Sequence, residues 1–149
     1  MKRRAFFGAA AGLALLMASA PAFAAKPEIF ATNGIAINGT DPVAYFTEGD
    51  YAYGDEAISA EWNGATWLFT SEEHRDLFLA DPEKYAPQYG GYCAFALAHN
   101  AIATTVPEAW TIHNGKLYLN YSTGVRSQWQ TDKDGFIEKA DGFWPGVLE

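Results

Sequence analysis

Sulfur is scarce in this chain of 149 residues. Its single cysteine, Cys93, excludes an intramolecular disulfide, a CxxC redox pair and a four-cysteine zinc site. Both methionines, Met1 and Met17, lie near the N-terminus, so the rest of the chain has no thioether, a soft donor that suits Cu(I). This composition excludes metal sites that are built from several sulfur atoms.

Basic residues are also few, since 10 Lys and Arg stand against 18 Asp and Glu and give a formal net charge of −8. This acidity argues against a nucleic-acid partner. The chain has no HExxH, GxSxG or P-loop sequence, and no GxGxxG between a strand and a helix. An apolar fraction of 49% is typical of a folded protein, and the length suits one domain. We therefore predict a single globular domain without enzymatic activity.

The N-terminal segment has the three parts of an export signal. Lys2–Arg4 is basic, Ala5–Ala20 is apolar, and Ala22–Ala24 supplies small residues for cleavage. The apolar run is shorter than the roughly 20 residues that a membrane span needs, and no later segment resembles a span. We predict a signal peptide over residues 1–24 and a periplasmic or secreted protein. Arg3–Phe7 is also similar to a twin-arginine signal, so the general and twin-arginine export routes both stay open.

Two β-hairpins are predicted, each with an Asn-Gly turn. The first runs from Ile58 to Phe69 and the second from Trp110 to Leu119. Asn-Gly is favoured in such turns because both positions need a positive φ. When the sequence is aligned with itself so that the first Asn-Gly turn falls on the second, identical residues also align after the turns. They are Leu68 with Leu119, Ser71 with Ser122, Arg75 with Arg126 and Asp81 with Asp132. We predict two hairpin–helix units that pack into one α+β domain. The alternative is convergence on a common hairpin-then-cap pattern.

The first hairpin is followed by a predicted helix with Thr70 as its cap and Glu73 reaching back. This helix ends at Asp81-Pro82, which can start another short helix. The remaining expectations are an N-terminal arm over 25–36, a strand over Val43–Phe46, helices over Tyr92–His99 and Val125–Trp129, a turn over Asp132–Gly135 and a helical turn over Phe136–Ala140.

Several segments together are similar to a known family: Asp41–Phe46, Trp62–Ser71, Phe78–Pro82, Lys84–Ala94 and Lys116–Asn120. The chain resembles the YHS-domain family, and more narrowly its stand-alone exported bacterial members. The resemblance spans Asn38 to Pro145 and implies a small α+β module, TRASH-like, related to domains that traffic or sense heavy metals.

The chain departs from the metal-linked members of that family at the positions of their cysteines. Those members have a cysteine after Asp-Pro-Val and a Phe-Cys-Ser-x-x-Cys pattern at the end of the hairpin. Here the three positions hold Ala44, Thr70 and His74. A site that needs soft thiolates therefore cannot be carried over intact.

Cys93 is the first candidate metal ligand, with His74 as its best partner and His99 as a third candidate; copper or zinc is the expected ion. The thiol could equally be redox-active, pair with another molecule, or be a small buried residue. His74 could equally be a partly buried helix histidine. On one continuous helix Cys93 and His99 would face different directions.

The alternative site is the Gly- and Pro-rich loop that carries Tyr85, Tyr89 and Tyr92. These side chains could line a pocket for a small ligand or a protein partner, with Cys93 in the core. They could also be tyrosines at the edge of the core with hydrated hydroxyls. The sequence thus predicts a non-enzymatic binding module, for a metal ion or alternatively for a small molecule or partner. It sets neither the ligand nor the oligomeric state.

Overall fold

Two hairpins, each followed by a helix, organise residues 25–149, the part of the chain that the computed structural model describes. Both predicted hairpins and both following helices are confirmed. The predicted signal peptide lies outside the described residues. In chain order the two units consist of β3 (Asp55–Trp62), β4 (Ala65–Phe69) and α2 (Glu72–Ala80), then β5 (Trp110–His113), β6 (Lys116–Leu119) and α5 (Thr123–Trp129).

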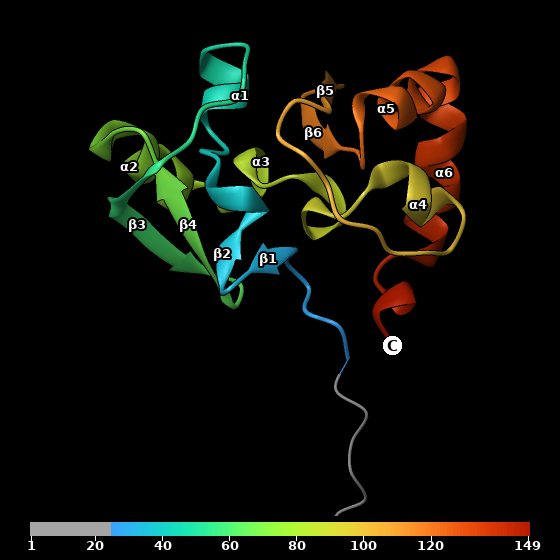
Figure 1. Cartoon of the computed structure of the whole chain (residues 1–149), viewed down its shortest axis with the longest axis horizontal. Coiled ribbons are helices and arrows are strands. Elements are labelled where there is room, and N and C mark those ends of the chain that lie inside the picture. The colour runs from blue at the N-terminus through green and yellow to red at the C-terminus, as the bar shows by residue number, and fades with distance from the viewer. Residues whose placement is uncertain (1–24) are drawn as a thin grey trace, which may run out of the picture.

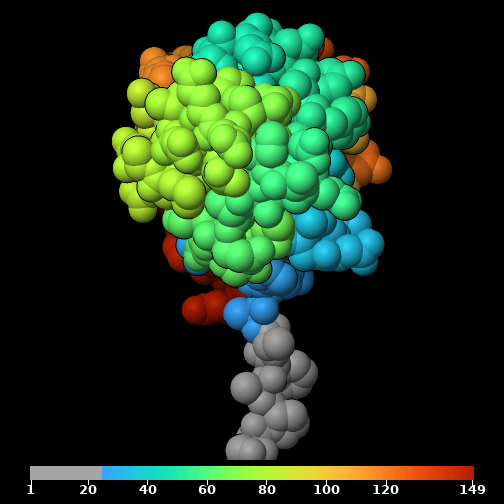
Figure 2. Space-filling view, turned by 90° about the vertical axis from the view of Figure 1, so that its left-hand side faces the viewer, coloured from blue at the N-terminus to red at the C-terminus, as the bar shows by residue number. Residues whose placement is uncertain are grey.

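The two units lie side by side, the first on the left and the second on the right of Figure 1. From the left-hand side the first unit faces the viewer and most of the second is behind it (Figure 2). In the first sheet the strand order is β1-β2-β4-β3, with β2 parallel to β4, whereas β5 and β6 form a separate pair. The remaining strands and helices are β1 (Ala31–Thr32), β2 (Ile35–Ala36), α1 (Ala44–Thr47), α3 (Pro82–Tyr85), α4 (Ala94–Ala98) and α6 (Lys133–Phe143), with 3-10 turns at Ile37–Gly39, Gln88–Gly91, Gln130–Asp132 and Gly146–Leu148.

An aromatic pair occurs at the same place in both units. The rings of Trp67 and Phe78 are 5.1 Å apart with an interplanar angle of 34°. At the matching positions Tyr118 and Trp129 are 5.0 Å apart at 37°. Each pair joins the second hairpin strand to the following helix, so the two units share internal geometry as well as sequence pattern.

One hydrophobic core runs through both units, and the domain is a single α+β domain as predicted. Burying an aromatic or large aliphatic side chain contributes about 1.5–3 kcal/mol, so this shared core joins the two units. Its largest fully buried side chains are Trp67, Trp129, Tyr45, Phe69 and Phe78.

Three local predictions are wrong. Val43–Phe46 is not a strand, because the Asp41 carboxylate accepts backbone N–H groups there and starts α1 instead. Ser71, not Thr70, caps α2 by accepting the N–H of His74. The segment predicted as a turn and a final helical turn is the continuous helix α6, because the side chain of Asp132 caps it by accepting the N–H of Gly135.

Two other helices are close to their predicted places. Pro82 is the first residue of α3, as expected from the Asp81-Pro82 pair. The helix expected over Tyr92–His99 is the shorter α4. None of the helices within residues 25–149 has the length and apolar character that crossing a bilayer requires.

Candidate functional site

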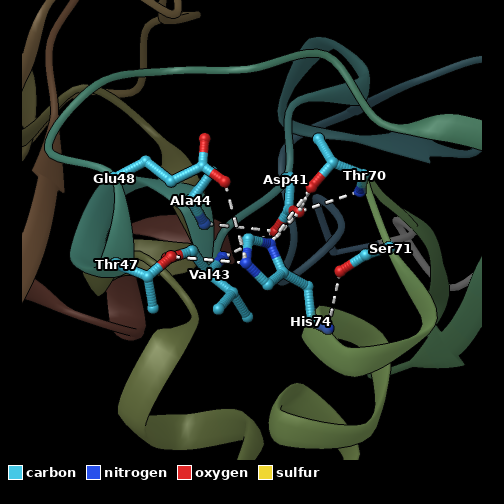
Figure 3. A network of polar contacts seen from close by, with 8 residues as sticks. All are labelled: Asp41, Val43, Ala44, Thr47, Glu48, Thr70, Ser71 and His74. Atoms are coloured by element: carbon cyan, nitrogen blue, oxygen red, sulfur yellow. Dashed lines mark hydrogen bonds and ion pairs between the residues drawn. The ribbon is translucent and has the colours of Figure 1, made fainter.

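A fully buried carboxylate, that of Asp41, links the start of α1 to the end of β4 (Figure 3). Its Oδ1 accepts the backbone N–H of Val43 at 2.8 Å and that of Ala44 at 3.3 Å. Its Oδ2 accepts both the backbone N–H and the hydroxyl of Thr70, each at 2.9 Å. Buried carboxylates are tolerated when such charge-assisted hydrogen bonds replace water.

His74 completes this arrangement from the first turn of α2. Its Nδ1 lies 2.6 Å from Oδ2 of Asp41, and its side chain is only 12% exposed. Since an ionised carboxylate can only accept hydrogen bonds, Nδ1 carries the proton in this contact. In a neutral imidazole this arrangement leaves the lone pair on the second ring nitrogen, Nε2, and a neutral imidazole with a free lone pair is the form that binds metals or accepts protons.

The Nε2 atom of His74 faces two side chains, that of Thr47 in α1 and that of Glu48 directly after it. The Thr47 hydroxyl lies 3.4 Å away, and Glu48 Oε1 lies 3.9 Å away. The Thr47 hydroxyl also donates to the carbonyl of Val43 at 3.2 Å, and its one hydrogen cannot serve both contacts. Glu48 is 54% exposed, so this side of the imidazole opens toward solvent.

The structure thus gathers the three positions that the family resemblance singles out. The N–H of Ala44, the N–H and hydroxyl of Thr70, and Nδ1 of His74 all meet the carboxylate of Asp41. In this chain a carboxylate lies at the centre of that group. Sequence analysis missed Asp41 and Glu48 as members of this site. An Asp before Pro at the start of a short helix is a signal that could have identified Asp41.

Cys93 lies elsewhere, at the start of α4, and is 1% exposed. Its Sγ donates to Asn120 Oδ1 at 3.5 Å and accepts the N–H of Tyr121 at 3.3 Å. Because His74 has none of these partners, and because α2 and α4 are on opposite sides of Figure 1, the structure does not bring Cys93 and His74 together.

His99 is also separate from the other two candidates. It follows α4, its Nδ1 lies 2.8 Å from the carbonyl of Phe95, and its ring packs at a tilt of 43° against the Phe95 ring with centroids 4.5 Å apart. Within residues 25–149 no three side chains of His, Cys, Asp or Glu gather into a group that could hold a metal ion.

The three tyrosines of the aromatic loop are buried. The Tyr85 ring contacts the ring of Phe46 edge-on, at 5.5 Å. Tyr89 and Tyr92 donate hydrogen bonds to Asp141 Oδ1 and to the carbonyl of Pro27.

Burial is the largest cause that raises the pKa of the Tyr89 and Tyr92 hydroxyls. For Tyr89 the neighbouring Asp141 raises the pKa further. These hydroxyls therefore stay protonated at neutral pH. Tyr89 lines a cavity of about 360 Å³, whose lining includes neither Tyr85 nor Tyr92.

Comparison of the chain with known protein families, with curated proteins and with solved structures finds no match.

Proposed function

We propose that this protein is an exported, non-enzymatic binding module of the YHS type that binds Cu(II) or Zn(II) at Nε2 of His74. The observation that carries the proposal is the 2.6 Å contact between His74 Nδ1 and the buried carboxylate of Asp41. Histidines that bind metals almost always donate their other ring N–H to a carboxylate, a carbonyl or water. The carboxylate fixes the tautomer and the direction of the ring, and it makes the outer nitrogen more basic.

Glu48 is the second donor. Its Oε1 is 3.9 Å from His74 Nε2, and a small rotation of this half-exposed side chain allows both atoms to reach one ion. Water fills the remaining positions, as at other open metal sites. With two protein donors the ion exchanges readily, and this suits a module that receives and passes on a metal better than one that needs it for folding.

The donor set selects the ion. Imidazole and carboxylate suit Cu(II) and Zn(II), whereas Cu(I) prefers sulfur, and Cys93 is not at this site. Cu(II) should bind more tightly than Zn(II), following the general order of affinities of divalent metals. The resemblance to metal-handling domains and the predicted export signal support the same assignment.

Two substitutions at one position test the proposal. The amide of Asn in His74→Asn overlaps Nδ1, so it can keep the contact with Asp41 while the outer nitrogen is lost. The amide of Gln in His74→Gln reaches the place of the outer nitrogen but loses that contact. Titration of Cu(II) and Zn(II) by calorimetry should show that both variants bind at least about tenfold more weakly, a loss of about 1.4 kcal/mol.

His113 provides the matched control, because its Nε2 lies 2.8 Å from the exposed Asp134. His113→Asn should leave the affinity of the protein for Cu(II) and Zn(II) unchanged, and Glu48→Gln should weaken that affinity. Equal affinity in the wild type and His74→Asn would refute the proposal, and loss of binding only in His113→Asn would move the site to the exposed pair.

A further inference from the structure

A cavity of about 360 Å³ lies where the two hairpin–helix units and the N-terminal arm meet. Trp62 and Asn63 come from the first hairpin, Lys116 from the start of β6, and Glu28 from the arm. None of these residues contributes to the His74 network. This volume is within the usual range for small-molecule pockets, about 300–1,000 Å³.

Tyr89 and Gly90, which we call the floor of the cavity, belong to an unusual stretch of backbone. Tyr89, Gly90 and Gly91 have consecutive positive φ values of 58°, 62° and 87°. The arm lies directly on this stretch, because the N–H of Phe30 donates to the carbonyl of Gly90 at 2.8 Å. A non-glycine residue with positive φ costs about 1–3 kcal/mol, and the hydrogen bond from Tyr89 to Asp141 helps to hold it there. The cavity therefore does not have to form when a ligand arrives.

Two tryptophans give the cavity aromatic walls. The Trp62 ring is fixed edge-on against Phe78, with centroids 5.6 Å apart, and the Trp144 ring against Tyr89, with centroids 6.0 Å apart. Both side chains are half-buried and line the cavity. The face of an indole attracts cations more strongly than any other side-chain ring, and methylated ammonium groups are bound in this way.

Charged groups of both signs line the same cavity. Glu28 and Glu83 carry carboxylates, and Lys116 carries an ammonium group. In the described part of the chain none of the three is in an ion pair. Carboxylates beside aromatic walls favour a cationic ligand, whereas the lysine requires an anionic group elsewhere on that ligand.

We propose that this cavity binds a small zwitterion in which a methylated ammonium group is joined to a carboxylate. The ammonium group lies between Trp62 and Trp144 near the two glutamates, and the carboxylate pairs with Lys116. This assignment is independent of metal binding at His74, because the two sites share no residue.

The test uses glycine betaine, with choline as the analogue that lacks the carboxylate. Chemical-shift changes in the folded, isotope-labelled protein should centre on the indole N–H groups of Trp62 and Trp144. Betaine should bind about two- to fivefold more tightly than choline, the range expected for one exposed ion pair with Lys116.

Lys116→Gln should remove this preference without unfolding the protein, because Lys116 is exposed. Glu83→Gln, also at an exposed residue, should weaken both ligands, and His74→Asn should change neither. The proposal is overturned if neither compound binds at millimolar concentration, if the shifts centre on another surface, or if choline binds as tightly as betaine.

Discussion

Asp41 accepts a hydrogen bond from His74 at 2.6 Å, and this contact joins the first turn of α2 to the start of α1. A second histidine–aspartate pair, His113 with Asp134, has nearly the same length, 2.8 Å. The side chain of Asp41 is 0% exposed, whereas that of Asp134 is 84% exposed. The two pairs have the same chemistry and differ in burial, so each is a control for the other.

Asp41→Asn should lower the free energy of unfolding by about 1–3 kcal/mol, the usual cost of leaving buried hydrogen-bonding groups without their partner. An asparagine can still accept from Val43 and Ala44, but its NH₂ group then faces the donors of Thr70 and His74. Asp134→Asn should cost less than about 1 kcal/mol, because exposed pairs contribute little. Urea unfolding of the two variants measures both values, and equal losses would show that burial of Asp41 has no energetic role.

The Cys93 thiol should react with a labelling reagent only as fast as the protein opens. Its side chain is 1% exposed and is hydrogen-bonded to Asn120 and Tyr121. The expected result is slow labelling of the native protein, rapid labelling in denaturant, and no fast phase in the native protein for Cu(II) or Zn(II) to suppress. Fast native labelling that metal suppresses would show instead that the thiol is an accessible ligand.

The hairpins, their Asn-Gly turns and the two-unit organisation could be predicted from the sequence because each depends on local pattern. Asn63 and Asn114 have φ values of 49° and 52°, as the turn type requires. Trp67 and Phe78 in one unit have the same spacing as Tyr118 and Trp129 in the other, and the structure shows that each pair is in contact.

The candidate site was only partly predictable, because its centre depends on contacts between distant residues. His74 could be named from the family resemblance, but its partner Asp41 is 33 positions away, and no local sequence pattern pairs the two residues. The same long-range contact explains why Thr70 does not cap α2, since its hydroxyl donates to Asp41 and Ser71 accepts the N–H of His74 instead. Whether Cys93 lay near a histidine could not be decided without the fold.

Gly90→Ala should be strongly destabilising. A Cβ at this residue would lie 1.7 Å from the carbonyl oxygen of Glu28, so the arm would have to move. The φ of 62° at Gly90 adds backbone strain for any other residue. Gly115→Ala is the matched control, because its φ is 75° but nothing lies within 4 Å of the added carbon.

The control should lose about 1–2 kcal/mol from backbone strain alone, and Gly90→Ala should lose at least about 2 kcal/mol more. Thermal or urea unfolding provides the comparison. Similar losses in the two variants would mean that the arm adapts freely, and the cavity floor would then not be preformed.

Stability should fall in alkali because burial raises the pKa of four tyrosines, Tyr45, Tyr89, Tyr92 and Tyr118. In the unfolded chain a tyrosine loses its proton near pH 10, about its ordinary pKa, whereas the buried hydroxyls stay neutral. The stabilisation from each raised pKa is therefore complete below about pH 10 and is lost as pH rises toward the folded-state value.

Each such group adds a slope of up to about 1.4 kcal/mol per pH unit. Urea unfolding from pH 9 to 11 should show the decline, and Tyr89→Phe should reduce its slope, whereas Tyr121→Phe, at an exposed tyrosine, controls for the loss of a phenol hydroxyl. A slope that Tyr89→Phe leaves unchanged would mean that this hydroxyl ionises equally in both states, and its contact with Asp141 would then have to open in alkali.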